Sequence, residues 1–264
     1  MKLIDIHCHI LPEIDDGPRN MEASLDLARG LKEAGVHTVA ATPHLREDHP
    51  RVRPREIAAR CRRLRTELDA AGVDLALVPG GEVDLVWAME ASDEELRLVS
   101  LSQRGTDLLV ETPYGLLTSS FEELLFGLML KGYRIVLAHP ERNPSFQQDT
   151  DRLAALVGRG TLVQLTVTSL SNPPNRSRSG NLARRLLRNG LAHILASDAH
   201  GVHTFDRMLF GPALEVARQL VGSRADWMVT EAPAAVLAGE LLPAQPAGRR
   251  RRWRDRFASR VSEP

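Results

Sequence analysis

The chain has 264 residues, 43% of them hydrophobic, and its 34 basic residues balance its 34 acidic residues. This length is enough for one large core, and α/β barrels commonly reach it as a single unit. The formal net charge of zero does not support a general polyanion-binding role. The two cysteines are too few for a disulfide framework, and the sequence has neither an apolar leader nor a run apolar enough to cross a membrane. We therefore expect a cytoplasmic protein without a membrane span.

Short apolar runs alternate with amphipathic segments along most of the chain. We expect strands at residues 2–7, 36–41, 75–78, 107–110, 134–138, 161–167 and 193–196. We expect helices at residues 21–34, 54–71, 93–99, 121–130, 150–157, 181–188, 214–221 and 233–237. Asn20 is a typical N-cap for the first helix, and Gly35 and Gly72 are typical residues to end the first two. The repeated order, with no linker that divides it, predicts an α/β fold with one parallel-stranded barrel over residues 1–242 and a basic tail over 243–264.

The first expected strand carries a polar face. Side chains alternate along a strand, so Asp5, His7 and His9 point to one side. Two imidazoles on one face can bind a single cation. Imidazole suits Zn, Fe, Ni and Cu, and nearby carboxylates extend the choice to Mn and Mg. For this segment alone, a hydrogen-bonded surface pair of histidines is the alternative interpretation.

Polar residues recur where the expected strands end. These residues are His7, His9, His44, Glu82, Glu111, His139, Asp198 and His200. In parallel barrels the catalytic groups gather at the C-terminal ends of the strands. Each residue alone is compatible with a capping or surface role, but their joint placement predicts a metal site. Such a site can hold more than one divalent ion, and paired ions assist phosphoryl displacement. A buried carboxylate such as Glu82 also needs positive charge nearby, because burying an unpaired charge is costly.

The sequence itself tests two other classes of enzyme. Cysteine-dependent tyrosine phosphatases need an arginine at the sixth position after the nucleophilic cysteine, but Ile14 follows Cys8 and Glu67 follows Cys61 at that spacing. That mechanism is excluded. Many amidohydrolases bridge their metals with a lysine at the end of a middle strand, whereas Lys131 precedes its strand. That form of the fold is disfavoured.

Several short motifs follow one another in a fixed order. They are D-I-H-C-H-I-L-P with D-D-G-P shortly after it, A-T-P-H, G-G-E-V, V-E-T-P, A-H-P-E-R and S-D-A-H. This set resembles the PHP (polymerase and histidinol phosphatase) superfamily, and most closely its CpsB/CapC branch, the manganese-dependent protein-tyrosine phosphatases of capsule and exopolysaccharide loci. The resemblance spans roughly residues 1 to 240. It implies a single-domain, distorted (β/α)7 TIM-like barrel with a trinuclear centre, in which Mn is favoured over Fe, Zn or Mg.

The resemblance also implies roles for individual residues. Three metals would be held by His7, His9, Glu82 and Asp198, by Glu82, Glu111 and His139, and by Asp16, His44 and His200. Arg142 resembles the family arginine that binds the phosphate, with a salt bridge to Glu141 or another rim acid as the alternative. Arg207 is a second catalytic candidate, although its spacing differs from the family pattern. Asp5 is expected to orient an imidazole, and Asp15 to be a turn residue.

Two positions depart from the branch pattern. Leu45 follows His44 where a second histidine often stands. The segment Gln164-Leu165-Thr166 lacks an asparagine of the family. We expect the first departure to alter contacts with the substrate at the rim more than metal binding.

The function implied by the resemblance is hydrolysis of phosphotyrosine on a protein, with the tail of a bacterial tyrosine kinase as the expected partner. The nearest alternative is a PHP phosphatase acting on a small phosphomonoester such as histidinol phosphate or a nucleotide. A regulatory protein with a structural metal site is disfavoured, because structural zinc sites are usually rich in cysteine. The basic run Arg249–Arg254 is compatible with nucleic-acid or acidic-membrane binding, but a solvated tail is favoured and no nucleic acid is expected. The oligomeric state stays open, a homo-oligomer included.

Overall fold

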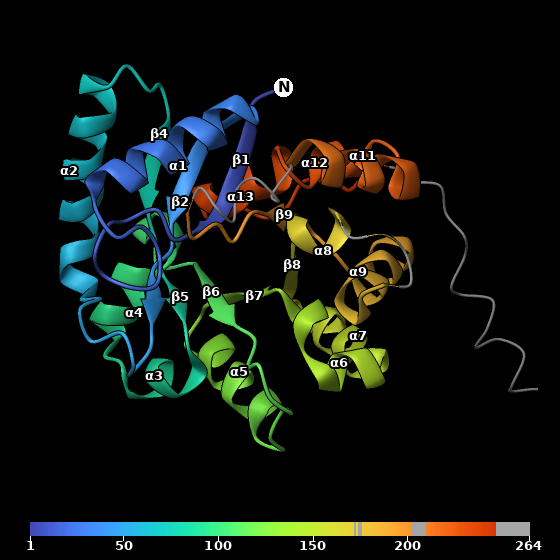
Figure 1. The fold of residues 1–264 in the computed structure, drawn as a ribbon. Coiled ribbons are helices and arrows are strands. Elements are labelled where there is room, and N and C mark those ends of the chain that lie inside the picture. The colour runs from blue at the N-terminus through green and yellow to red at the C-terminus, as the bar shows by residue number, and fades with distance from the viewer. Residues whose placement is uncertain (172, 174–175, 202–209, 247–264) are drawn as a thin grey trace, which may run out of the picture.

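The computed structural model describes residues 1–171, 173, 176–201 and 210–246 (Figure 1). Two predictions fall outside these residues: the catalytic candidate Arg207 and the basic run Arg249–Arg254. Among the described residues, no helix combines the length and apolar composition that a membrane crossing requires.

Parallel strands form the centre of the fold. One sheet has the order β1-β2-β4, with strands Leu3–Cys8, Val36–Ala41 and Ala76–Pro79. The other has the order β3-β5-β6-β7-β8-β9, with strands His44–Leu45, Glu82–Val83, Asp107–Glu111, Arg134–Ala138, Leu162–Thr166 and Ile194–Ala196. All their pairings are parallel. The predicted α/β class with a parallel arrangement of strands is therefore confirmed.

The two sheets adjoin at both sides. Two residues separate β2 from β3 and β4 from β5, so the chain passes directly from one sheet into the other. On the opposite side, Cys8 forms a parallel bridge with Ala199, and the backbone N–H of His9 donates to the Ala199 carbonyl at 2.8 Å. This contact joins the two sheets along a second edge, and closure into one barrel stays a prediction.

The link between β4 and β5 requires glycine. A Cβ on Gly81 would lie 2.4 Å from Cδ2 of Leu45 and 3.1 Å from Cβ of Val99. Any larger residue would therefore push against the buried side chains of Leu45 and Val99. Glycine thus lets the chain pack closely just before Glu82, whose side chain is completely buried.

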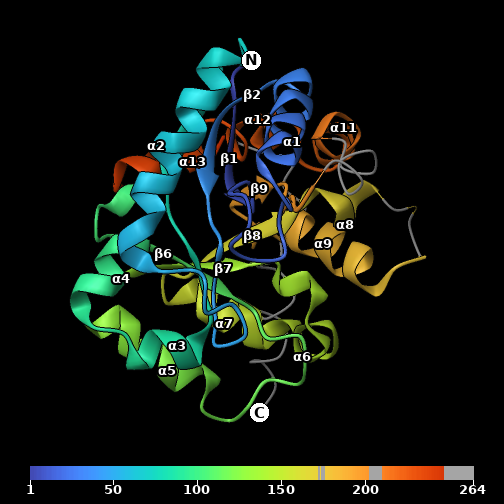
Figure 2. The same cartoon turned by 60° about the vertical axis from the view of Figure 1, so that its left-hand side comes forward.

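Helices surround the strands on the outside, as Figures 1 and 2 show. They are α1 Met21–Glu33, α2 Pro54–Ala70, α3 Leu85–Glu90, α4 Asp93–Val99, α5 Phe121–Leu130, α6 Pro144–Gln148, α7 Thr150–Gly158, α8 Val167–Ser171, α9 Arg178–Asn189, α11 Phe210–Val221, α12 Arg224–Trp227 and α13 Glu231–Ala238. Two short 3-10 helices span Leu101–Gln103 and Pro140–Arg142. All eight predicted helices are present, with boundaries that differ by up to four residues, whereas α3, α6, α8 and α12 were missed.

The first helix illustrates why these segments fold as they do. The Asn20 side chain accepts a hydrogen bond from the Ala23 N–H at 2.9 Å, which satisfies one of the free donors at the helix start. Leu27, Ala28 and Leu31 form its buried stripe. Gly35 follows the helix with φ of +90°, a conformation that glycine adopts without strain.

Candidate metal centre

Four buried side chains meet at the C-terminal ends of β1 and β9 and the start of β5. Their donor atoms are Nε2 of His7, Nε2 of His9, Oε2 of Glu82 and Oδ1 of Asp198. From His7 Nε2, the other three atoms lie at 3.3, 3.1 and 3.2 Å, respectively. From His9 Nε2, the Glu82 and Asp198 oxygens lie at 3.4 and 3.5 Å.

These separations suit a cation. Bonds of about 2.0–2.2 Å to a central ion place neighbouring donor atoms about 2.8–3.6 Å apart, in octahedral or tetrahedral coordination. The five distances around His7 and His9 fall in this range. The donor atoms are thus spaced as neighbouring ligands of one ion would be.

In three histidines, the ring nitrogen Nδ1 is held by a hydrogen-bond acceptor. Nδ1 of His7 lies 3.0 Å from Oε1 of Gln164, which also accepts from the backbone N–H of His139 at 3.3 Å. Nδ1 of His9 lies 2.9 Å from Oδ2 of Asp15, and Nδ1 of His200 lies 2.9 Å from a backbone carbonyl. A proton held on Nδ1 leaves the lone pair on Nε2, which is the usual arrangement for an imidazole ligand. In all three residues Nε2 faces carboxylate oxygens of the cluster.

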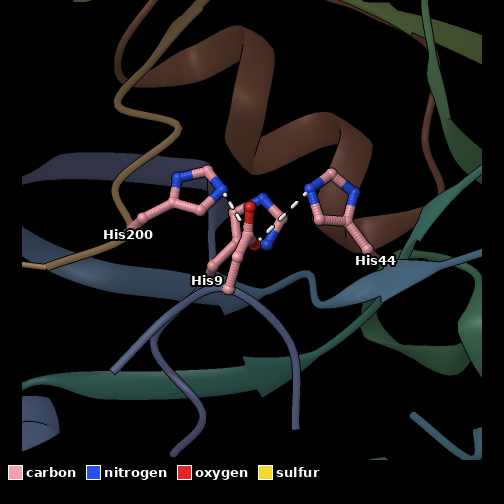
Figure 3. A group of neighbouring side chains, drawn as sticks. His9, His44 and His200 are labelled. Atoms are coloured by element: carbon pink, nitrogen blue, oxygen red, sulfur yellow. Dashed lines mark ion pairs between the residues drawn. The ribbon is translucent and has the colours of Figure 1, made fainter. Parts of the chain in front are cut away.

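A second group of donors comprises His9, Asp16, His44 and His200. Figure 3 shows the rings of His44 and His200 approaching from opposite sides, with His9 between them. Oδ1 of Asp16 lies 3.3 Å from Nε2 of His200 and 3.7 Å from Nε2 of His44. The Asp16 side chain is 54% exposed, so this group lies at the open side of the site.

A third group joins His44, Glu82 and Glu111. Nδ1 of His44 lies 3.1 Å from Oε2 of Glu82 and 3.7 Å from Oε2 of Glu111. The predicted third partner, His139, contacts the other Glu82 oxygen, Oε1, at 2.9 Å. The three groups overlap, because His9, His44 and Glu82 each belong to two of them.

The electrostatics of the site call for positive charge. Burial favours neutral His7, but the Glu82 and Asp198 carboxylates outweigh it and raise the pKa of His7 to about 9. Burial would raise the pKa of Glu82, yet the surrounding histidines hold that pKa well below its usual range. Burial together with the Glu82 charge raises the pKa of Glu111 to about 7. Protons on the histidines or bound cations must therefore balance the carboxylates.

Unpartnered polar atoms favour cations over protons alone. Oε2 of Glu82 and Nδ1 of His44 are both buried and lie 3.1 Å apart, but among the described residues neither atom makes a hydrogen bond of good geometry. Leaving such groups unsatisfied costs about 1–3 kcal/mol each. Since both atoms belong to the donor groups above, the residues present fit bound divalent metals.

Arg142 lies at the edge of this cluster. Its Nη1 donates to Oδ2 of Asp198 at 2.6 Å, and its side chain is 30% exposed. The neighbouring Glu141 is buried and accepts instead from the Thr166 N–H and the Ser169 hydroxyl, at 3.0 and 2.9 Å. Arg142 is thus paired with an acid of the cluster, and its side chain stays partly open to solvent.

Two residues of the site have left-handed backbones. His139 has φ of 35° and Asp198 has φ of 55°. Such conformations are uncommon outside glycine and are found at functional sites, where the surrounding structure holds them. The Asp198 N–H donates to the carbonyl of His7 at 2.8 Å, which fixes this turn against β1.

Two predicted roles need correction. Among the described residues, Asp5 makes no hydrogen bond to an imidazole: its Oδ1 accepts from the backbone N–H groups of His7 and Ser197, at 3.2 and 3.0 Å. It therefore holds β1 next to the turn after β9. Asp15 is more than a turn residue, because it accepts from His9 Nδ1 as well as from the backbone of Gly17 and His44.

Other residues near the site were not predicted from the sequence. Gln164 was noted only for its place in a motif, although it fixes His7. Nη1 of Arg46 donates to Oε1 of Glu111 at 3.0 Å. The buried Asn143 donates to the carbonyls of Pro113 and Gly115, which fixes the loop after β6. The sequence did contain a signal for each residue. Gln164 is a polar residue inside an otherwise apolar strand, and Arg46 and Asn143 each lie close to a motif residue.

Comparison with solved structures supports the fold. A structure described as that of YwqE from Bacillus subtilis and CpsB from Streptococcus pneumoniae, "unique metal-dependent tyrosine phosphatases", superposes with a TM-score of 0.82 at 31% identity. The match covers 94% of this chain and all of the other. An organophosphorus hydrolase from Deinococcus radiodurans superposes with a TM-score of 0.55 at 15% identity, covering 89% of this chain and 92% of the other. The second likeness concerns the fold alone.

Sequence comparison gives the same grouping. Tyrosine-protein phosphatase YwqE of Bacillus subtilis is 32% identical over 252 residues, which are 94% of this chain and 98% of YwqE. Tyrosine-protein phosphatase CpsB of Streptococcus pneumoniae is 24% identical over 251 residues, covering 91% of this chain and all of CpsB. The family model "Capsular polysaccharide synthesis, CpsB/CapC" matches residues 3–238. With a match over almost its whole length, this chain belongs to the CpsB/CapC family.

Proposed function

We propose that this protein hydrolyses phosphotyrosine on proteins, using divalent metals held in the centre described above. The observation that carries the proposal is the set of three overlapping groups of histidine and carboxylate donors next to Arg142. The names of YwqE and CpsB as tyrosine-protein phosphatases support the same activity.

The proposed centre is trinuclear, and manganese is its expected metal. His7, His9, Glu82 and Asp198 would hold one ion, and the remaining donors would hold the others: Asp16, His44, Glu111, His139 and His200. Bound divalent ions would polarise the phosphoryl oxygens and lower the pKa of a water molecule, which makes it a nucleophile at neutral pH.

The protein's own side chains prepare the site for this chemistry. Gln164 and Asp15 hold the Nδ1 protons of His7 and His9, so that both Nε2 lone pairs point inward. Arg142 would bind two phosphate oxygens through its planar guanidinium group and stabilise the charge that builds up as the ester bond breaks. Its present partner, Asp198, keeps it directed toward the cluster. Arg207, the second proposed catalytic residue, lies outside the described residues.

The proposed substrate is a protein carrying phosphotyrosine, with the tail of a bacterial tyrosine kinase as the expected partner. The leaving group is then a phenol with a pKa of about 10, which leaves more readily than an alkyl alcohol. The family description, capsular polysaccharide synthesis, agrees with such a partner.

The proposal extends to the shape of the molecule. We infer that residues 1–242 form one domain and that its strands close into a distorted seven-membered barrel, in which β2 with β3 and β4 with β5 each act as one strand. The short links within these pairs and the bridge between Cys8 and Ala199 support this closure.

One activity series tests the function. Protein stripped with a chelator is reloaded separately with Mn, Fe, Zn or Mg, and turnover is measured on a phosphotyrosyl peptide and on histidinol phosphate. We expect activity to return most strongly with manganese and to favour the peptide. His44→Ala and Asp198→Ala should abolish turnover while the circular dichroism spectrum stays that of the wild type. Preference for histidinol phosphate, or full activity in either variant, would contradict the proposal.

A further inference from the structure

A groove adjoins the metal centre on the side of the loops that follow β1 and β3. Its volume is about 620 Å³, and its lining includes Glu13, Asp15, Arg19, Asp48, His49, Arg51 and Arg60. It shares a wall with the centre, because Asp15 is the hydrogen-bond partner of His9. The ring of His49 also stacks on that of His44, with the centroids 5.2 Å apart.

Two of the acidic residues in the lining are already engaged. Asp15 accepts three hydrogen bonds, from His9 Nδ1 and from the backbone N–H groups of Gly17 and His44, and its side chain is 1% exposed. Asp48 forms two hydrogen bonds with Arg46, at 3.0 and 2.6 Å. Neither carboxylate is therefore free to neutralise a cation in the groove.

The arginines of the groove are less engaged. Within the described part of the chain, the exposed guanidinium groups of Arg19 and Arg51 have no ion pair or hydrogen bond. Arg60 pairs through Nη2 with Glu56 at 3.1 Å, whereas its buried Nε has no hydrogen-bond partner among the described residues. Glu13 is the one acid of the lining that lacks a side-chain partner among these residues. The charge left available to a ligand is therefore positive.

We propose that this groove binds an anionic side chain of the substrate, a carboxylate or a second phosphate, next to the phosphotyrosine in the metal centre. The inference rests on the proposed function and adds to it a preference for acidic peptides. Neighbouring residues of an extended peptide are about 3.3 Å apart along the chain, so a residue one or two positions from the target tyrosine can reach the adjoining groove. Arginine suits both kinds of anion, because its planar fork matches carboxylate and phosphate oxygens.

The test compares three phosphotyrosyl peptides that differ only in the residues next to the target: neutral, glutamate, or a second phosphotyrosine. The double variant Arg19→Ala/Arg51→Ala removes two exposed charges from the groove. Its matched control, Arg62→Ala/Arg63→Ala, removes two exposed arginines of α2 that do not line the groove. p-Nitrophenyl phosphate, which has no flanking residues, reports on the centre alone.

We expect the wild type to favour both acidic peptides in kcat/KM. In the groove variant, the ratio of kcat/KM for an acidic peptide to kcat/KM for the neutral peptide should fall by roughly three- to tenfold, as expected for two exposed charge interactions. Its turnover of p-nitrophenyl phosphate, and all rates of the control variant, should stay at the wild-type level. Glu13→Gln should act in the opposite direction and strengthen the preference. A larger effect on one acidic peptide would show whether carboxylate or phosphate is the better ligand.

A binding measurement separates this inference from the proposed function. The same peptides are made with a non-hydrolysable difluoromethylphosphonate in place of the target phosphate, and their Kd values are measured by calorimetry. Equal Kd values for acidic and neutral peptides, or an equal loss of preference in the control variant, would overturn the inference and leave the phosphatase function intact. Acidic preference in binding, together with turnover of p-nitrophenyl phosphate but of no phosphotyrosyl peptide, would support the groove and contradict the proposed function.

Discussion

Replacing Gln164 with leucine tests whether the fixed imidazole of His7 matters for metal binding. The substitution keeps the approximate size of the side chain and removes Oε1, which accepts from His7 Nδ1 and from the His139 N–H. Two buried donors would then be unsatisfied, at about 1–3 kcal/mol each. Among the residues that the structure describes, the amide Nε2 of Gln164 is buried without a hydrogen-bond partner, so its removal recovers part of this cost. We expect a net loss of about 1–5 kcal/mol in the free energy of unfolding of the metal-free protein.

The same substitution should weaken metal binding. Loss of the acceptor lets His7 change its tautomer or turn its ring, and losing such an outer partner usually costs about 10- to 100-fold in metal affinity. Denaturant unfolding measures the first effect, and calorimetric titration with manganese measures the second. Gln164→Glu is the matched control, since it keeps an acceptor oxygen and should stay within about tenfold of the wild-type affinity. A leucine variant that binds manganese as tightly as the wild type would refute the argument.

Three further predictions concern other parts of the molecule. Asn143→Ala removes the cap of α6 and the donors to the carbonyls of Pro113 and Gly115. Urea unfolding should therefore show a free energy of unfolding that is lower by about 2–4 kcal/mol. A loss below about 0.5 kcal/mol, the level of an ordinary surface substitution, would contradict this role. His193 accepts from the Val163 N–H, and burial lowers its pKa from 6.5 to about 4. Below pH 6.5 the histidine is protonated in the unfolded chain, whereas in the folded protein it stays neutral down to about pH 4. The free energy of unfolding therefore falls as the pH is lowered through this window, by about 2 kcal/mol at pH 5. His193→Asn should remove that part of the acid sensitivity, and an unchanged pH profile would show that another group causes it. Removing metal with a chelator should lower the Tm, since ligand at 100 times its Kd stabilises by about 2.7 kcal/mol; equal Tm values with and without manganese would contradict metal binding to the folded state.

The sequence predicted the longer elements well because their signals are local. Asn20 and Gly35 bound the first helix, and the apolar spacing between them fixes its buried face. The missed helices α3, α6, α8 and α12 have four to six residues, too few for a helical period to emerge. Two of them begin at a capping side chain: Asp84 accepts from the Val86 and Trp87 N–H groups at the start of α3, and Asn143 accepts from the Ser145 N–H at the start of α6.

The site was predictable where its residues follow strands and not where they act through a neighbour. His7, His9 and Asp198 stand at the ends of parallel strands, so the topology brings them together. Which histidines contact Glu82 depends on how the two sheets meet, and no local sequence pattern predicts this. The resemblance placed His139 with Glu82 and Glu111; in the structure His139 contacts Glu82, and His44 lies close to both carboxylates. The supporting roles of Gln164 and Asp15 arise from contacts across 157 and 6 residues of chain, respectively, with no repeated spacing to reveal them.

Anomalous diffraction from crystals grown with manganese would test the central claim most directly. We predict a peak between Nε2 of His7, Nε2 of His9, Oε2 of Glu82 and Oδ1 of Asp198, with further peaks next to His44 and Glu111. Well-ordered crystals in which these side chains contact one another directly, with no anomalous peak among them, would contradict it.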